Sequence, residues 1–341
     1  MILNGADPNA VASAAVILQR GGLLGLPTET VYGLAADACN DQAVAQIFAA
    51  KGRPSNHPLI VHVANADGMA YFAREVPDFA AKLIDAFWPG PLTLILPRRS
   101  GVAGAAAGGQ DSVGLRCPSH PVAQAVLLQA HALGVWGVAA PSANVFGRVS
   151  PTTPAHVAGE FGPDLCILDG GACEVGIEST IVDCTRPDPV LLRPGVLTPE
   201  QLSLACGRTV QLSAALLGQV DLQAPRASGT LASHYAPRAQ VRLVEASNLV
   251  DQLDTWAQHS ARHASLALWT GLPVAVPTCL GARVHQGRMP QDAVACAHDL
   301  FAQLRAFDDL GVHEIWVETP PRAAAWDGVR DRLQRAATPV R

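Results

Sequence analysis

The sequence predicts an α/β protein with two domains. Short apolar runs of four or five residues alternate along the chain with longer stretches that carry helix-capping residues, as is typical of α/β folds. At 341 residues, the chain is about twice the common domain length, so two domains are expected. Apolar residues make up 49% of the chain and charged residues 16%. That composition excludes a disordered chain and a coiled coil.

The first helix carries the clearest signals. Asp7 precedes Pro8, apolar residues recur at helical spacing through Leu18, and Gly21 and Gly22 follow. These are an N-cap, a proline in the first turn and glycines beyond the C-terminus. The other elements of the first domain follow by the same alternation. We expect strands at 23–26, 59–63, 92–96, 113–116, 136–140, 177–183 and 190–193, and helices at 41–50, 78–87 and 120–132.

Regular alternation fades after Leu204, and the next segment is rich in Gly, Pro, Ser and Gln. Such a composition predicts an interdomain linker at 207–237, between domains at 1–206 and 238–341. In the second, smaller domain we expect strands at 241–244, 266–269 and 314–317, and helices at 247–258, 292–307 and 323–335. No clustered polar motif stands out there, so the chemistry is expected in the first domain.

Charge and cysteine usage narrow the classes of protein. The net charge is −5, so no chain-wide positive field exists to hold duplex nucleic acid, and any anion must be bound locally. The eight cysteines are scattered and form no CxxC motif, which indicates buried thiols in a reducing compartment. No apolar run reaches about 18 residues. We therefore expect a cytoplasmic protein with no membrane partner.

Two polar strings follow predicted elements near the N-terminus. PTETVYGLA (27–35) places hydroxyl and carboxyl side chains just past a strand end, although Thr28 and Thr30 would also suit a simple turn. KGRPSNHPLIVH (51–62) places Lys51 and Arg53 at a helix C-terminus beside a proline-stiffened loop. Two such cations suit a polyphosphate, while either alone would be explained by capping of the helix.

Three further strings place polar residues on or beside apolar strands. In DSVGLRCPSHP (111–121), Ser112 and Arg116 share one face, and the arginine requires an anion, for which a structural salt bridge is the alternative explanation. APSANVFGRVSP (140–151) brings small hydroxyls and glycine close to backbone amides. GIESTIVDCT (176–185) and LLRPGVLT (191–198) add Ser179 and Arg193.

The residue types of these strings form two chemical sets. One set, hydroxyls with a histidine and an arginine, suits a small amphoteric acid. The other, lysine and arginines with serines, suits a phosphate chain. The sequence shows no hydrolase elbow, metal-ligand run or dinucleotide fingerprint. The residues by themselves therefore predict a site for a nucleotide and a small polar substrate.

Taken in order, these strings resemble the YrdC-type domain of threonylcarbamoyl-AMP synthases. The matching motifs are PTETVYGLA, KGRP with PLIVH, WPGPLTLIL (88–96), SAN (142–144), and EST with LLRPG. The similarity covers 7 to about 200, and SGTLASHYAP (228–237) resembles the linker motif of the long form. It implies a YrdC-like twisted α/β catalytic domain and a smaller α/β, Rossmann-like C-terminal domain. The distinctive residues of the linker, with Tyr235 offering a ring and a hydroxyl, predict that 207–237 folds back as a lid over the active site, while a passive spacer between the domains is the alternative.

The resemblance implies a nucleotidyltransferase of tRNA modification. L-threonine, bicarbonate or carbon dioxide, and ATP would give threonylcarbamoyl-AMP and pyrophosphate, toward threonylcarbamoyladenosine in tRNA. Positioning and charge neutralisation would drive the reaction, with Mg²⁺ on the phosphates and no covalent nucleophile from the protein. Docking to the transferase that acts next, or to tRNA, is a further expected partnership.

The resemblance also assigns residues, with no metal ligand among them. Those implied to bind L-threonine are Thr30, His62, Arg116, Ala140 and Ser179. Those implied to bind ATP are Lys51, Arg53, His57, Ser112, Ser142, Ser150, Arg193 and Tyr235. Two positions depart from the family pattern: His57 stands where asparagine is common, and Ser228 stands where proline is common.

Two other function classes predict different sequence features. A carbamoyl-transferring maturation factor would carry an acylphosphatase-like segment and clustered zinc-finger cysteines, and the sequence shows neither. A noncatalytic RNA-binding module is disfavoured by the net charge of −5, which still allows a local basic patch.

Overall fold

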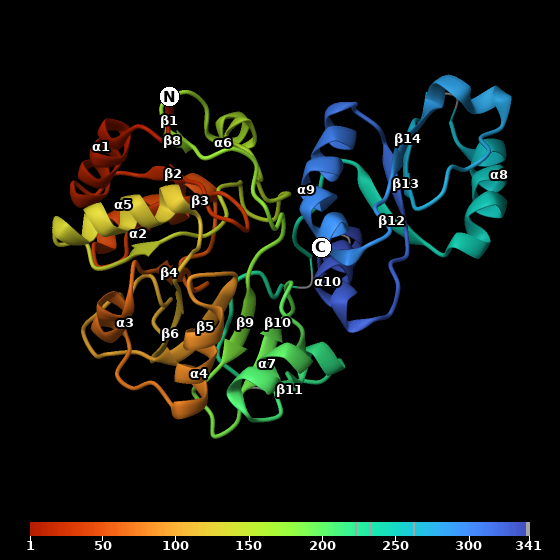
Figure 1. Cartoon of the computed structure of the whole chain (residues 1–341). Coiled ribbons are helices and arrows are strands. Elements are labelled where there is room, and N and C mark those ends of the chain that lie inside the picture. The colour runs from red at the N-terminus through yellow and green to blue at the C-terminus, as the bar shows by residue number, and fades with distance from the viewer. Residues whose placement is uncertain (222–223, 232, 262, 339–341) are drawn as a thin grey trace. The chain divides into compact units, whose positions relative to one another are not determined.

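The computed structural model describes residues 1–221, 224–231, 233–261 and 263–338, and it divides into two compact units (Figure 1). The first unit comprises Met1–Phe146 and Ser150–Thr230, and the second comprises Gly147–Val149 and the chain from Leu231 onward. The described residues between 207 and 230, where the sequence predicts a linker, therefore belong to the first unit.

The first unit is built on one mixed sheet of eleven strands. Their order across the sheet is β1-β8-β2-β3-β7-β4-β6-β5-β9-β10-β11. Parallel pairs such as β4 with β6 alternate with antiparallel pairs such as β5 with β6. The strands are β1 (Ile2–Asn4), β2 (Leu24–Leu26), β3 (Gly33–Asp37), β4 (Ile60–His62), β5 (Leu92–Pro97), β6 (Ser112–Arg116), β7 (Val138–Ala139), β8 (Cys166–Asp169), β9 (Thr180–Asp183), β10 (Val190–Arg193) and β11 (Gln211–Leu212).

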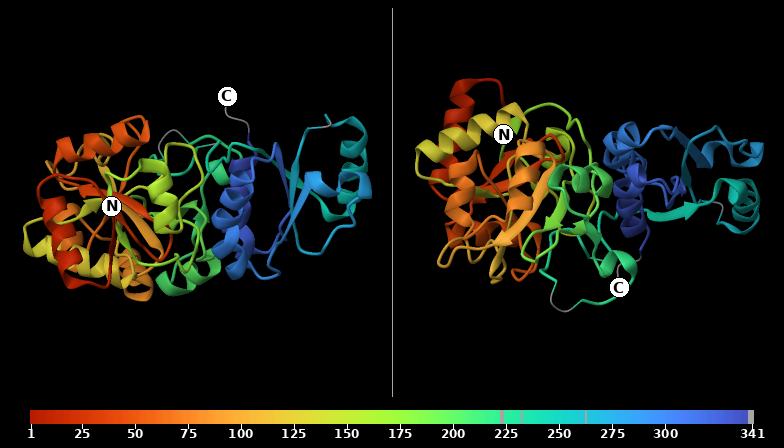
Figure 2. Two further views of the ribbon diagram at one scale, coloured as in Figure 1. Left: turned by 90° about the horizontal axis from the view of Figure 1, so that it is seen from above. Right: turned by 60° about the horizontal axis from the view of Figure 1, so that its bottom comes forward.

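Helices cover this sheet and complete two hydrophobic cores. They are α1 (Pro8–Gln19), α2 (Asp41–Lys51), α3 (Ala66–Phe72), α4 (Asp78–Phe87), α5 (Pro121–Ala132), α6 (Pro154–Phe161) and α7 (Pro199–Cys206). Helices α1 and α5 lie side by side (Figure 2), and α4 packs against α7. The predicted cap of α1 is confirmed, because the Asp7 carboxylate accepts a hydrogen bond from the Asn9 amide at 2.9 Å.

The α/β class is confirmed, but several elements differ from the sequence prediction. The sequence analysis missed β1, β3, β8, β11, α3, α6 and α7 in this unit. The strand expected at 136–140 is only Val138–Ala139, and a Cβ atom on the preceding Gly137 would lie 2.7 Å from the Phe72 ring. The strand expected at 177–183 begins at Thr180, and the Ser179 carbonyl just before it accepts from Arg193.

The second unit contains a parallel sheet in the order β12-β15-β13-β14. An all-parallel sheet with covering helices fits the Rossmann-like expectation. The strands are β12 (Gln240–Val244), β13 (Leu266–Thr270), β14 (Val284–Arg288) and β15 (Glu314–Glu318), and the helices are α8 (Leu249–His259), α9 (Ala293–Asp309) and α10 (Asp327–Ala337). Strand β14 was missed because its sequence, VHQGR, is mostly polar.

Short 3₁₀ turns complete the fold at Ala215–Leu217, Ala246–Asn248, Thr278–Arg283 and Ala324–Trp326. Within the described ranges, no helix combines the length and the apolarity needed to cross a bilayer.

Candidate active site

Six consecutive strands of the first sheet carry or adjoin most of the predicted site residues. The strands are β7, β4, β6, β5, β9 and β10, in that spatial order (Figure 1). Ala140 follows β7, His62 ends β4, Ser112 and Arg116 begin and end β6, Ser179 precedes β9, and Arg193 ends β10. The sheet order thus gathers motifs that are far apart in the sequence.

Arg116 is the centre of a first cluster, formed with the turn that follows β2. Its Nη2 atom pairs with Glu29 Oε1 at 2.8 Å, and its Nη1 atom donates to Thr30 Oγ1 at 2.7 Å. Its Nε atom donates to the Gly90 carbonyl at 3.3 Å. Burial alone would raise the pKa of Glu29, but Arg116, together with the backbone amides of Glu29 and Ser119, outweighs burial and holds that pKa below its ordinary value. The salt bridge expected for an arginine in an apolar strand is therefore present.

His62 stands beside this cluster, since it is the register partner of Arg116 across β4 and β6. Its side chain is buried, and its Nδ1 atom lies 3.4 Å from the Ile60 carbonyl. Burial, reinforced by the charge of Arg116, lowers the pKa of His62 to about 3. The imidazole is therefore neutral near pH 7 and offers hydrogen bonds rather than charge.

Backbone segments lie close together near Ala140. The Ala140 amide donates to the Ile60 carbonyl at 3.0 Å. A Cβ atom on Gly33 would lie 3.1 Å from the Ala140 Cβ. Glycine at position 33 allows the turn after β2 to approach Ala140.

A second cluster forms around Arg193. Its Nε and Nη2 atoms donate to the Ser179 carbonyl at 3.1 and 2.9 Å, and its Nη1 atom donates to the Ser228 carbonyl at 2.9 Å. The Ser179 hydroxyl lies 2.7 Å from the Thr93 hydroxyl. Arg193 thereby joins β9, β10 and a segment far along the chain.

The side chains of Lys51 and Arg53 do not cap α2. Backbone amides provide the cap at the left-handed Gly52, with φ of 61°: the Gly52 amide donates to the Ala49 carbonyl and the Arg53 amide donates to the Phe48 carbonyl. The buried Lys51 ammonium instead donates to the carbonyls of Ser142 and Asn144. Burial, aided by the charge of Arg53, lowers the pKa of Lys51 well below its ordinary value. Arg53 Nη2 contacts the Pro58 carbonyl at 3.0 Å and the Ser228 hydroxyl at 3.4 Å.

The other residues expected to bind ATP lie in different surroundings. His57 is half-buried, and its ring lies edge-on to the Phe146 ring with 5.6 Å between the ring centroids. Burial, together with the charges of Arg53 and Arg226, lowers the pKa of His57. The Ser150 hydroxyl donates to the Glu178 carboxylate.

Ser112 lines a small hollow with Ser228. Tyr235 belongs to the second unit, where it is buried near the Phe301 ring.

Four residues of these clusters were not singled out as site residues from the sequence: Glu29, Thr93, Glu178 and Ser228. Glu29 was detectable in principle, because it lies beside Thr30 in PTETVYGLA and because Arg116 was known to require an anion. Thr93 stands in the apolar string WPGPLTLIL, and its contact with Ser179 depends on the pairing of β5 with β9. Only the sheet register could have predicted that contact.

Residues 226–230 dock onto the first unit. The Arg226 amide donates to Gln110 Oε1 at 2.8 Å, and its Nη2 atom donates to the Gly108 carbonyl at 2.9 Å. Ser228 then meets both Arg53 and Arg193. This segment, which we call the latch (residues 226–230), adjoins the two arginines expected to bind ATP.

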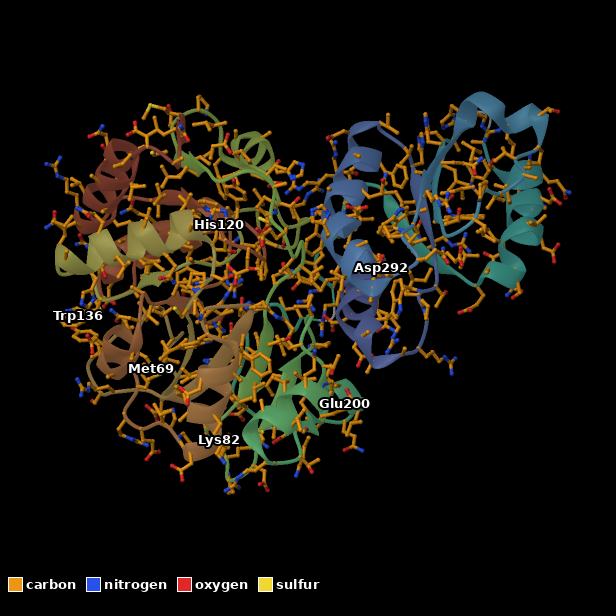
Figure 3. All side chains as sticks on the ribbon, viewed as in Figure 1. Met69, Lys82, His120, Trp136, Glu200 and Asp292 are labelled. Atoms are coloured by element: carbon orange, nitrogen blue, oxygen red, sulfur yellow. The ribbon has the colours of Figure 1, made fainter. Side chains whose placement is uncertain are left out.

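His120 and the described cysteines lie outside the two clusters. His120 accepts the Val122 amide at the start of α5 and contacts the Gly170 carbonyl at 3.2 Å (Figure 3). The seven cysteines with described side chains are free thiols. In the described parts of the chain, no three His, Cys, Asp or Glu side chains are grouped to hold a metal ion.

Comparisons with known proteins agree across both units. Residues 16–195 match the Sua5_yciO_yrdC family model, described as "Telomere recombination", and residues 197–338 match the model described as "Threonylcarbamoyl-AMP synthase, C-terminal domain". The threonylcarbamoyl-AMP synthase of Pyrococcus abyssi is 36% identical over 95% of this chain and 93% of that protein. The Bacillus subtilis synthase is 36% identical over 97% and 93%. The crystal structure of P. abyssi Sua5 complexed with L-threonine has a TM-score of 0.90 and 33% identity, covering 99% of this chain and 97% of that one.

The neutral state of His62 predicts a measurable pH dependence of folding. The folded pKa of about 3 lies below the ordinary value of 6.5, so the unfolded chain takes up the proton first. Stability from this residue is complete above pH 6.5 and is lost as the pH falls toward 3. Between pH 7 and 5 the loss is about 2 kcal/mol.

Urea unfolding at pH 7 and at pH 5 measures this loss of stability. His62→Gln should lose much of the pH dependence, while the exposed control His259→Gln should keep it. Equal pH dependence in the wild type and His62→Gln would show that His62 is not held neutral by the fold.

Proposed function

This chain belongs to the threonylcarbamoyl-AMP synthase family, and on that premise we propose that it converts L-threonine, bicarbonate or carbon dioxide, and ATP into threonylcarbamoyl-AMP and pyrophosphate. The proposal is carried by one observation: β6 and β10 finish at the same end of one sheet, where β6 carries the Arg116 cluster, suited to an amino acid, and β10 carries the Arg193 cluster, suited to phosphates. The relative complexed with L-threonine supports the first substrate. Similarity over almost the whole chain to proteins of this name disfavours the maturation-factor and RNA-module alternatives.

The reaction needs placement more than covalent help. The unprotonated threonine amine adds to carbon dioxide and releases a proton, or adds to bicarbonate and releases water, which gives a carbamate. One carbamate oxygen then attacks the α-phosphorus of ATP, and pyrophosphate leaves in line. Charge accumulates on the phosphate oxygens, where fixed cations stabilise it. Buried guanidinium groups already held by carbonyl and hydroxyl oxygens need little reorganisation for that task.

The threonine side of the site is assigned to the cluster around Arg116. We propose that Arg116 binds the substrate carboxylate and that the neutral His62 and the hydroxyls of Thr30 and Ser179 surround its polar groups, with Ala140 closing the pocket. Arginine presents a planar fork that matches a carboxylate. Burial of these side chains supports the assignment, since a dry pocket strengthens each polar contact.

The ATP side is assigned to the cations and hydroxyls around Arg193. The proposed residues are Lys51, Arg53, His57, Ser112, Ser142, Ser150, Arg193 and Tyr235. Magnesium is proposed to arrive on the triphosphate, because Mg²⁺ keeps most of its water and prefers phosphate oxygens, and the described residues show no protein-only cluster for it. Magnesium would supply charge neutralisation on the phosphates.

The latch is proposed to act as a lid on the phosphate site. Ser228 contacts Arg53 and Arg193, and Arg226 lies close enough to His57 to affect its pKa. A lid excludes water from an adenylate that would otherwise hydrolyse. The product is then available to the transferase that acts on tRNA, for which docking here is a prediction. The free thiols of the described cysteines support the cytoplasm as the compartment.

Substrate choice tests the proposed function. Pyrophosphate release with ATP and bicarbonate should be strong with L-threonine and weak with valine, because a missing hydroxyl leaves buried polar groups unpaired at about 1–3 kcal/mol each. Serine, which lacks only a methyl group, should be disfavoured by about tenfold. All twenty amino acids should be compared at equal concentration. Equal turnover with valine would contradict the assignment of the pocket.

The lid is tested by releasing the latch while every charge beside the phosphate site is kept. The variant Gln110→Ala removes both hydrogen bonds between the Gln110 side chain and the Arg226 backbone, and it should raise the KM for ATP by about three- to tenfold. Gln42→Ala is a matched control, because Gln42 is an exposed glutamine of the same unit. If the ATP saturation curves of Gln110→Ala and wild type superimpose, the latch is only a tether.

A further inference from the structure

Glu29 is a buried carboxylate to which the family resemblance assigns no role. It lies in the turn after β2, next to Thr30, and is only 3% exposed. Its Oε1 atom pairs with Arg116 at 2.8 Å. Both carboxylate oxygens are buried, and neither accepts a hydrogen bond of normal geometry from the described residues, although the backbone amides of Glu29 and Ser119 lie near enough to lower the pKa of the carboxyl.

Stability alone explains this ion pair poorly. Removing two charges from water costs several kcal/mol per ion, and replacing a buried pair by apolar residues is often neutral or stabilising. A buried pair at the place where an amino acid is proposed to bind calls for a reason in binding. The geometry of Arg116 gives one.

Arg116 has five N–H donors, and three of its contacts are already made. Nε binds Gly90, Nη1 binds Thr30 and Nη2 binds Glu29. One N–H on Nη1 is left, and Nη2, whose 2.8 Å ion pair with Glu29 lacks hydrogen-bond geometry, keeps its own N–H groups for a substrate carboxylate. Arg116 can therefore hold a substrate without releasing Glu29.

The charges around the pocket are balanced. The charged side chains that act on the neighbouring His62 are Arg116 and Glu29, of opposite sign, and His62 is itself neutral. A free amino acid is a zwitterion with the same pair of charges. Burying its ammonium group away from water without an anion would cost far more than a lost neutral hydrogen bond.

We propose that Glu29 is the counter-ion of the substrate ammonium group, so that Arg116 and Glu29 together recognise the two charged ends of L-threonine. The inference rests on the proposed function and extends it by naming a substrate-binding residue. Glu29 thereby selects ligands with a free α-amine and holds the nitrogen on which the carbamate must form. The other reading, that Glu29 only orients Arg116, makes a different prediction for ligands without an amine.

The test compares two ligands by isothermal titration calorimetry without ATP. One is L-threonine, and the other is 2,3-dihydroxybutanoate of matching stereochemistry, in which a hydroxyl replaces the amine. Glu29→Gln should weaken threonine binding by about tenfold or more. It should change binding of the hydroxy acid by less than about threefold, because that ligand never used the carboxylate charge. Glu174→Gln, an exposed carboxyl change in the same unit, should alter neither.

If Glu29→Gln weakens the binding of both ligands by the same factor, Glu29 acts only through Arg116 and the proposal is wrong. Unchanged binding of both ligands would also overturn the proposal. If the variant does not fold, the wild type still decides, since it should bind the hydroxy acid about tenfold or more weaker than threonine. Equal affinity in the wild type refutes the ammonium site. Because these are binding measurements, they remain distinct from the proposed function, which fails separately if the wild type makes no threonylcarbamoyl-AMP.

Discussion

The ion pair between Arg116 and Glu29 is the interaction on which the first unit's site depends. A guanidinium group at the end of a buried strand must be compensated, because an unpaired charge away from water is very costly. Compensation comes from the turn after β2, through Glu29 and Thr30. That requirement ties the turn to β6 and places both beside His62. One electrostatic demand thus determines where the proposed threonine pocket lies.

The same principle organises the phosphate side with different partners. Arg193 and Arg53 are buried and are held partly by backbone carbonyls, of Ser179 and Pro58 respectively. Both also reach Ser228, so the latch is held by the cations it adjoins. Carbonyl contacts hold both guanidinium groups in place, and a guanidinium group offers a planar fork that suits phosphate oxygens. The proposed amino-acid and nucleotide sites thus lie on one sheet, with β5 and β9 between the strands that carry Arg116 and Arg193.

The sequence predicted the parts of the site that depend on local signals, and it did not predict contacts between residues far apart in the chain. Capping signals predicted α1 and α2, and apolar strands ending in polar residues predicted the positions of Arg116 and Arg193. Short or polar elements such as β8 and β14 were missed, because their pairing, and not their local pattern, makes them strands. The position of Lys51 at a helix C-terminus marked it as a candidate from the sequence, yet its partners, the carbonyls of Ser142 and Asn144, lie far along the chain. Side-chain partners of this kind follow from the strand order of the sheet, which no local signal contains.

The central claim is that this chain joins a one-carbon unit to the threonine nitrogen and the product to AMP. The most direct measurement is mass spectrometry of the adenylate formed from L-threonine, ATP and bicarbonate labelled with heavy carbon. The account predicts threonylcarbamoyl-AMP carrying a single heavy carbon, formed in step with pyrophosphate. An adenylate without the label, or threonyl-AMP formed without bicarbonate, would contradict it.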